Sequence, residues 1–205
     1  MNLKKFLSVV LASSMLLLFA CDSSSEARLE PSAIAELRKD YPITGRAPAH
    51  MSMMEPTLDI IFESSESVLV LEVIGEMTHH AEELLTGDEV IDQKMADHGI
   101  PGEVVYFVYP VRVIQDEAGI YEEGAEIAIY NNVIFEDVTP MLERGDRISI
   151  PLQEGHDHSD RVPFSVFGLY YVTADDYVLS AFDEKDGALT GYSLDEYLRE
   201  VQSYR

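Results

Sequence analysis

Apolar and polar residues alternate most regularly between residues 103 and 131. Five apolar side chains occupy every second position of the first half of this segment: Val105, Phe107, Tyr109, Val111 and Val113. A period of two puts all five on one face of a β-strand, and that face must be buried. Turn residues follow, and the alternation resumes at Ala125, Ile127 and Ile129. The pattern predicts a two-stranded β-ribbon. Pro110 predicts an edge position or a bulge within it, because proline has no N–H for the ladder.

Further strands are predicted on both sides of the ribbon. Residues 68–74 are almost continuously apolar and rich in β-branched side chains, which is typical of a strand covered on both faces. Three shorter strands are expected at 148–152, 165–172 and 177–182. Together these segments predict a mainly β chain that forms a small, mostly antiparallel barrel.

The clearest helix is at the C-terminus. Ser193 and Glu196 have the spacing of a capping box, in which each side chain satisfies an otherwise unpaired backbone N–H. The apolar residues of this segment repeat with a helical period: Leu194, Tyr197, Leu198 and Val201. We expect this helix to pack against the sheet.

The segments between these elements are less regular. Short helices are expected at 31–39 and 58–62, where a few apolar residues have helical spacing. Residues 75–102 form a polar excursion of 28 residues. A structureless loop of this length is unusual in a compact domain, so we expect the excursion to be either partly helical or a mobile flap.

The net charge limits the possible partners. With 14 Lys and Arg against 38 Asp and Glu, the chain of 205 residues has a formal charge of −24. Nucleic acid is not expected as a partner, because its binding depends on neutralising phosphates with basic side chains. The acidity favours solubility and self-repulsion, and recognition of a basic partner or of cations is the alternative.

The first residues have the layout of an export signal. Two lysines precede a mainly apolar run at 6–19, which is too short to span a bilayer comfortably. Leu18, Ala20 and Cys21 follow at the positions of a lipobox, so this segment resembles the signal peptide of a bacterial lipoprotein. The resemblance implies cleavage between Ala20 and Cys21, attachment of lipid such as palmitate to Cys21, and anchoring to a membrane of the bacterial cell envelope. The alternative is an uncleaved signal anchor with an incidental cysteine.

This resemblance divides the chain into three parts. They are a signal peptide at 1–20, the lipidated cysteine with a flexible tether or loop at 21–55, and a barrel domain with its C-terminal helix at 56–205. The strands and turns of the third part, at 67–73, 111–114, 124–127 and 142–148, are similar in order to those of uncharacterised exported bacterial proteins, many of them lipoproteins. The resemblance implies an OB-like β-barrel and carries over no catalytic residues.

Histidines are the candidate metal ligands. His156 and His158 would point to the same side of an extended strand and share Zn²⁺ or Cu²⁺. A site normally needs three or four ligands, and His79 and His80 would supply the rest if the 75–102 excursion folds over the barrel. The alternative is a solvated acidic loop, because the glycine and serine of this segment favour a turn.

Three other groups have alternative interpretations. The Met-rich segment 50–54 suits Cu(I) through its thioether and imidazole groups, or packs against the barrel. Glu72 lies within an apolar strand and is expected to pair with Arg112 or Arg147. Five tyrosines would form an aromatic ligand platform, or else pack within the sheet: Tyr106, Tyr109, Tyr130, Tyr170 and Tyr171.

The sequence contains no Gly-x-Ser-x-Gly, no His-Glu-x-x-His and no P-loop. The leading hypothesis is therefore a membrane-anchored envelope lipoprotein that is not an enzyme, needs no cofactor, and binds an unidentified protein or small molecule. The alternative is a lipoprotein that binds zinc or copper through the histidine cluster. An envelope hydrolase is a less favoured third hypothesis.

The anchor generates a direct prediction. Full-length protein should partition into the detergent phase of a Triton X-114 extraction, because acyl chains on Cys21 bury methylene groups at about 0.8 kcal/mol each. The Cys21→Ala variant should lack the lipid by mass spectrometry. Recovery of the wild type as an unacylated, water-soluble chain would contradict the lipoprotein hypothesis.

Overall fold

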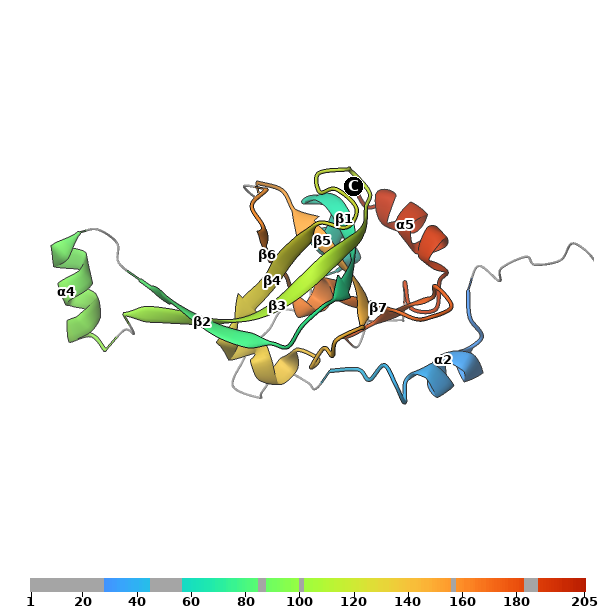
Figure 1. Cartoon of the computed structure of the whole chain (residues 1–205), viewed down its shortest axis with the longest axis horizontal. Helices are drawn as coiled ribbons and strands as arrows, with labels where there is room; N and C mark the ends of the chain where they lie inside the picture. The colour runs from blue at the N-terminus through green and yellow to red at the C-terminus, as the bar shows by residue number, and fades with distance from the viewer. Residues whose placement is uncertain (1–27, 45–56, 85–87, 100–101, 156–157, 183–187) are drawn as a thin grey trace, which may run out of the picture.

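The computed structural model describes residues 28–44, 57–84, 88–99, 102–155, 158–182 and 188–205. It confirms a mainly β chain with a C-terminal helix (Figure 1). The strands are β1 (Ser65–Val73), β2 (Thr78–Glu83), β3 (Glu103–Asp116), β4 (Glu126–Asn132), β5 (Arg147–Gln153), β6 (Arg161–Pro163), β7 (Tyr170–Val172) and β8 (Val178–Ser180). The α-helices are α2 (Pro31–Leu37), α3 (Leu58–Phe62), α4 (Glu89–Asp97) and α5 (Leu194–Gln202), and the 3₁₀ helices are η1 (Val133–Val138) and η2 (Val166–Gly168).

All eight strands belong to one sheet, in the order β6-β4-β3-β1-β5-β7-β8, with β2 added beside β3. Every pair is antiparallel except β4 and β6, which run parallel. Within the described part of the chain, the pairings leave the sheet open between β6 and β8. None of the described helices is both long and apolar enough to cross a membrane.

Strand β1 is buried on both faces, as its apolar sequence predicts. Leu69, Leu71 and Val73 pack into the main core together with β3, β4 and β5. Val68 and Val70 point to the opposite face and pack into a second core. All five side chains are fully excluded from solvent, so each face of β1 contributes to a different core.

The second core is closed by α3 and α5. The side-chain oxygen of Ser193 accepts a hydrogen bond from the N–H of Glu196 at 3.3 Å, which confirms the predicted N-cap of α5. The four predicted apolar positions of α5 are all buried against the sheet. Tyr197 packs on Tyr170 with ring centroids 5.0 Å apart, and its hydroxyl accepts a hydrogen bond from buried Ser149 at 3.2 Å.

The predicted ribbon is β3 with β4, but the prediction of an edge position or a bulge at Pro110 is wrong. Strand β3 lies inside the sheet, and its register with β4 is unbroken at Pro110. On one side β3 pairs with β4. On the other it pairs with β2 over 103–108 and with β1 over 111–116. The carbonyl of Pro110 accepts a hydrogen bond from the N–H of Ile74, which belongs to the connection between β1 and β2. The N–H and C=O of a strand residue point to the same side, so the missing donor of Pro110 faces this gap between two partner strands.

Gly75 lets this connection approach the proline closely. A Cβ atom at position 75 would lie 2.7 Å from Cγ of Pro110. The two residues therefore fit together only because position 75 has no side chain.

Part of the predicted tether is folded onto the body. Helix α2 lies within the segment 21–55, and Ile34, Leu37 and Tyr41 pack against the main core. The guanidinium of Arg38 donates a hydrogen bond to the carbonyl of Ser180 at 2.7 Å. Residues 28–44 are thus a structural part of the domain. The sequence pattern did not predict this packing, because the segment has few apolar residues and the three that pack are widely spaced.

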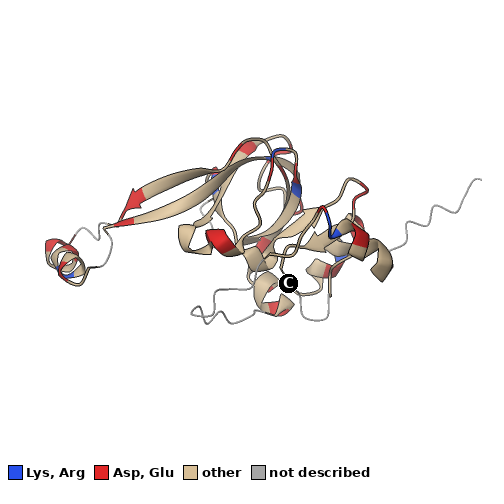
Figure 2. Cartoon of the chain, turned by 90° about the horizontal axis from the view of Figure 1, so that it is seen from below, with Lys and Arg blue, Asp and Glu red and all other residues tan. Residues whose placement is uncertain are grey.

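The excursion 75–102 contains both a strand and a helix. Its helical part, α4, confirms the prediction that the segment is partly helical. The strand β2 was not predicted, because its residues are exposed on nearly every position and show no alternation. Figures 1 and 2 show β2 and the adjoining part of β3 leaving the body together, with α4 at their far end. We call β2, residues 103–105 of β3, and α4 the arm.

Two buried tyrosines make the domain sensitive to high pH. Burial, reinforced by the nearby Asp146 carboxylate, raises the pKa of Tyr171 to about 12. Burial also raises the pKa of Tyr109, although its hydroxyl accepts a hydrogen bond from the N–H of Leu142. In the unfolded chain a tyrosine loses its proton near pH 10. The stabilising contribution of the two protonated tyrosines is therefore fully present below about pH 10, and it is lost as the pH rises toward 12.

The Tyr171→Phe variant tests this assignment. Its free energy of unfolding, measured with urea at a series of pH values from 8 to 12, should decline less steeply above pH 10 than that of the wild type. Below pH 9 the variant should be less stable by about 0.5–1.5 kcal/mol, because the Tyr171 hydroxyl donates a hydrogen bond to the carbonyl of Pro42. Equal slopes above pH 10 would contradict a raised pKa at this residue.

Candidate functional site

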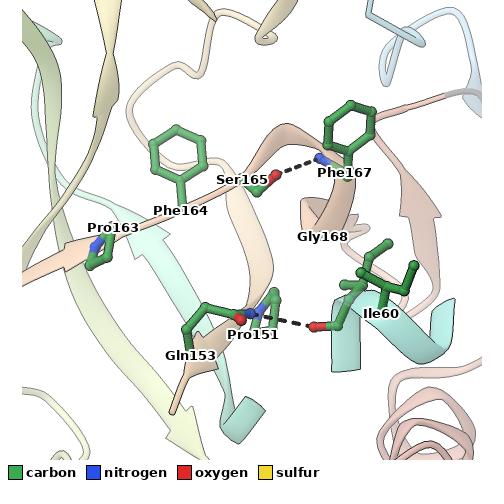
Figure 3. A pocket seen from close by; sticks show the side chains of 9 residues that line it. Ile60, Pro151, Gln153, Pro163, Phe164, Ser165, Phe167 and Gly168 are labelled. Carbon is green, nitrogen blue, oxygen red and sulfur yellow. Dashed lines mark hydrogen bonds between the residues drawn. The ribbon is translucent and has the colours of Figure 1, made fainter. Parts of the chain in front are cut away.

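A mainly apolar pocket lies where α3, β5 and the β6–η2 segment meet (Figure 3). Its volume is about 360 Å³, which is within the range of pockets that hold small ligands. Nine residues line it: Ile60, Ile61, Pro151, Gln153, Pro163, Phe164, Ser165, Phe167 and Gly168.

Helix α3 supplies the apolar rim of the pocket. Thr57 is the N-cap residue, and Phe62 is fully buried in the second core, which fixes the orientation of this short helix. Ile60 then faces away from the core and is 56% exposed. A large aliphatic side chain is thus held at the mouth of a pocket, where a ligand would cover it.

Pro151 and Gly168 form a closely packed part of the wall. Pro151 is buried in β5, where it pairs with Val68 of β1, so the proline does not disturb the register. A Cβ atom at position 168 would lie 2.8 Å from ring atoms of Pro151 and 3.2 Å from Cγ2 of Ile61. Glycine therefore allows η2 to approach both β5 and α3, and a larger residue would push the walls apart.

The other side of the pocket is aromatic. Phe164 is buried, and its ring packs edge-to-face on Phe107 with centroids 5.9 Å apart. Phe167 packs in the same way on Phe182, with centroids 4.6 Å apart. These contacts hold two of the lining rings against neighbouring rings.

The polar groups of the pocket are few and already engaged. The amide of Gln153 donates a hydrogen bond to the carbonyl of Ile61 at 3.4 Å and accepts one from the hydroxyl of Ser64 at 3.0 Å. The oxygen of Ser165 accepts a hydrogen bond from the N–H of Phe167 at 3.3 Å, which caps η2. None of the nine lining residues has an ionisable side chain. The arrangement suits binding of an apolar group and supplies no acid or base to it.

The predicted metal ligands that the structure describes lie beside different carboxylates. His79 Nε2 lies 2.8 Å from Oε2 of Glu136, and His80 Nε2 lies 3.6 Å from Oε1 of Glu82. His158 Nε2 lies 2.9 Å from Oε1 of Glu66. Each of these imidazoles thus has a carboxylate neighbour of its own.

The described residues contain no group of three or more His, Cys, Asp or Glu side chains placed to hold one metal ion. His156, the partner of His158 in the zinc or copper hypothesis, lies outside the described residues, as does the Met-rich segment 50–54. Binding of zinc or copper by His79, His80, His156 and His158 therefore stays a prediction. Ala20 and Cys21 also lie outside the described residues.

The five tyrosines of the predicted platform are divided between the interior and the surface. Tyr109, Tyr170 and Tyr171 are buried and belong to the two cores. Tyr106 and Tyr130 are partly exposed and pack edge-to-face with centroids 5.2 Å apart. A platform of all five is therefore not formed, because alternate residues of a strand point to opposite faces.

The predicted partner of Glu72 is present. Its carboxylate lies 3.2 Å from Nη1 of Arg112, on the neighbouring strand β3. The other candidate, Arg147, instead lies 2.8 Å from the carboxylate of Asp176.

Comparisons of the chain with models of protein families, with curated proteins and with solved structures found no match.

The pocket itself was not predicted from the sequence. Its residues come from 60–61 and from two segments much later in the chain, 151–153 and 163–168, and only the fold brings them together. One signal was available at Ile60. The face shared by Leu58, Ile61 and Phe62 in the predicted helix leaves Ile60 outside, as an apolar side chain without a core to bury it.

Proposed function

We propose that this chain is a non-catalytic binding protein of the bacterial cell envelope that takes a small, mainly apolar ligand in the pocket beside α3. The observation that carries the proposal is the composition of the pocket. Its described lining consists mostly of aliphatic, aromatic and proline side chains, and it has no ionisable group. Such a lining gains free energy from excluding water from an apolar ligand.

The location is supported by the sequence of the first residues. The lipobox that ends at Cys21 implies export, cleavage after Ala20 and lipidation, so the folded domain would be held close to a membrane surface. At that surface a binding protein meets apolar molecules that leave or enter the bilayer.

The sheet supports a finer proposal about the fold. We infer an OB-like arrangement from the strand order, in which β1 lies between β3 and β5 and β6 runs parallel to β4. This assignment concerns architecture only, because a fold of this kind carries many different functions.

The neutral apolar fluorophore N-phenyl-1-naphthylamine tests the pocket. A soluble form that begins at Asp22 keeps every residue that the structure describes and removes the lipid that would also bind the probe. This protein should bind the fluorophore with an increase in fluorescence. The Ile60→Gln variant should weaken the binding by about fivefold or more, because it removes most of the apolar contact at the mouth.

Ile134→Gln is the matched control. Ile134 is 57% exposed, nearly the same as Ile60, but it lies in η1 and does not line the pocket. Its substitution should leave the affinity unchanged. An equal loss in both variants, or no loss in either, would place the fluorophore elsewhere and contradict the proposed site.

A further inference from the structure

Helix α4, at the end of the arm, presents apolar side chains to solvent. Val90 is 63% exposed and Ile91 is 46% exposed, and no residue of the helix is buried. Met95 lies one helical turn after Ile91, on the same face. Val90, Ile91 and Met95 form what we call the arm-tip patch.

The start of α4 is fixed so that the patch is presented in a defined way. The carboxylate of Asp88 accepts hydrogen bonds from the N–H of Val90 at 2.9 Å and of Ile91 at 3.3 Å. This N-cap holds the first turn of the helix, which carries the two most exposed apolar residues of the patch.

Strand β2 of the arm is joined to the body by side-chain contacts. Glu82 of β2 forms an ion pair with Arg161 of β6 at 2.5 Å. His79 of β2 contacts Glu136 of η1 at 2.8 Å. These contacts lie at the strand that leads to α4. The arm is therefore an ordered projection of the sheet.

The charges around the arm-tip patch are almost all negative. The sequence from 78 to 103 contains seven acidic residues and one basic residue, Lys94. Figure 2 shows this distribution along the end of the arm. Acidic side chains therefore surround the apolar patch.

This charge selects among the possible occupants of the patch. An anionic bilayer surface would repel the acidic border, so insertion of the patch into lipid is disfavoured. A second copy of the chain carries the same border and the same formal charge of −24, so self-association is disfavoured as well. The described part of the body does not cover the patch, because α4 lies away from it in both views (Figures 1 and 2).

We propose that the arm-tip patch docks onto a partner protein whose apolar surface is bordered by Lys and Arg. The exposed aliphatic side chains of α4 would pack into that surface, in the manner of an amphipathic helix in a groove. The acidic border would meet the basic rim, which speeds association and excludes acidic partners. This interaction is separate from the pocket beside α3 and does not depend on a ligand there.

A synthetic amphipathic helix of leucine and lysine serves as the probe, because it has an apolar stripe bordered by positive charge. Fluorescence anisotropy with the soluble form that begins at Asp22 should show binding that weakens as salt is raised. The Val90→Gln/Ile91→Gln variant should weaken the binding by about tenfold or more, since both anchors are lost while glutamine keeps the helix propensity.

Ile134→Gln/Met141→Gln is the matched control. Both of these residues are exposed apolar side chains outside the arm, at 57% and 79% exposure. The control should bind the probe as the wild type does. No loss in either double variant would mean that the probe is attracted by net charge alone, and an equal loss in both would mean unspecific apolar contact. Either result would overturn the proposal.

Two further measurements separate the other occupants. Sedimentation velocity should find the wild type monomeric, and a dimer that dissociates in the Val90→Gln/Ile91→Gln variant would overturn the proposal in favour of self-association. Vesicles of phosphatidylglycerol should not retain the soluble wild type. Retention that the same variant abolishes would identify a membrane surface as the occupant instead.

Discussion

Strand β1 is the element on which the rest of the structure depends, because two apolar cores share its two faces. Leu69 and Leu71 face the main core, and Val68 and Val70 face the second. Each fully buried side chain of this kind contributes about 1.5–3 kcal/mol to folding before the entropy cost. A polar substitution at any of these four positions would thus destabilise one core directly. It would also destabilise β1, against which the other core packs.

The candidate binding regions lie at the ends of elements that this frame holds. Helix α3 leads directly into β1, so the position of Ile60 at the pocket mouth follows from the burial of Phe62 and Val68. The arm is different, because α4 contributes no buried residue to either core. Its form comes from the β2–β3 pairing and from the contacts of β2 with β6 and η1. Because such regions contribute little to the cores, their sequences can vary without loss of the fold. Binding surfaces are commonly found in regions of this kind.

Sequence patterns predicted those elements whose signal is local. The alternation in β3 and β4, the continuous apolar run of β1 and the cap and period of α5 all depend on neighbouring residues, and the structure contains them. Strand β2 was missed because it pairs through its backbone and presents polar side chains. The position of Pro110 was misjudged because a strand that changes partners cannot be recognised from one strand alone. The predicted tether included residues that belong to the folded domain, because the core residues against which Ile34 and Leu37 pack are distant in the sequence.

Native-state hydrogen exchange tests the central claim about β1 most directly. If both cores depend on this strand, the amides of Val68 to Val73 should exchange only through global unfolding, with a free energy equal to that measured by urea. The amides of α4 should exchange far faster, through local opening of the arm. Exchange of the β1 amides at a free energy well below the global value would contradict the account, because it would show that the two cores open without each other.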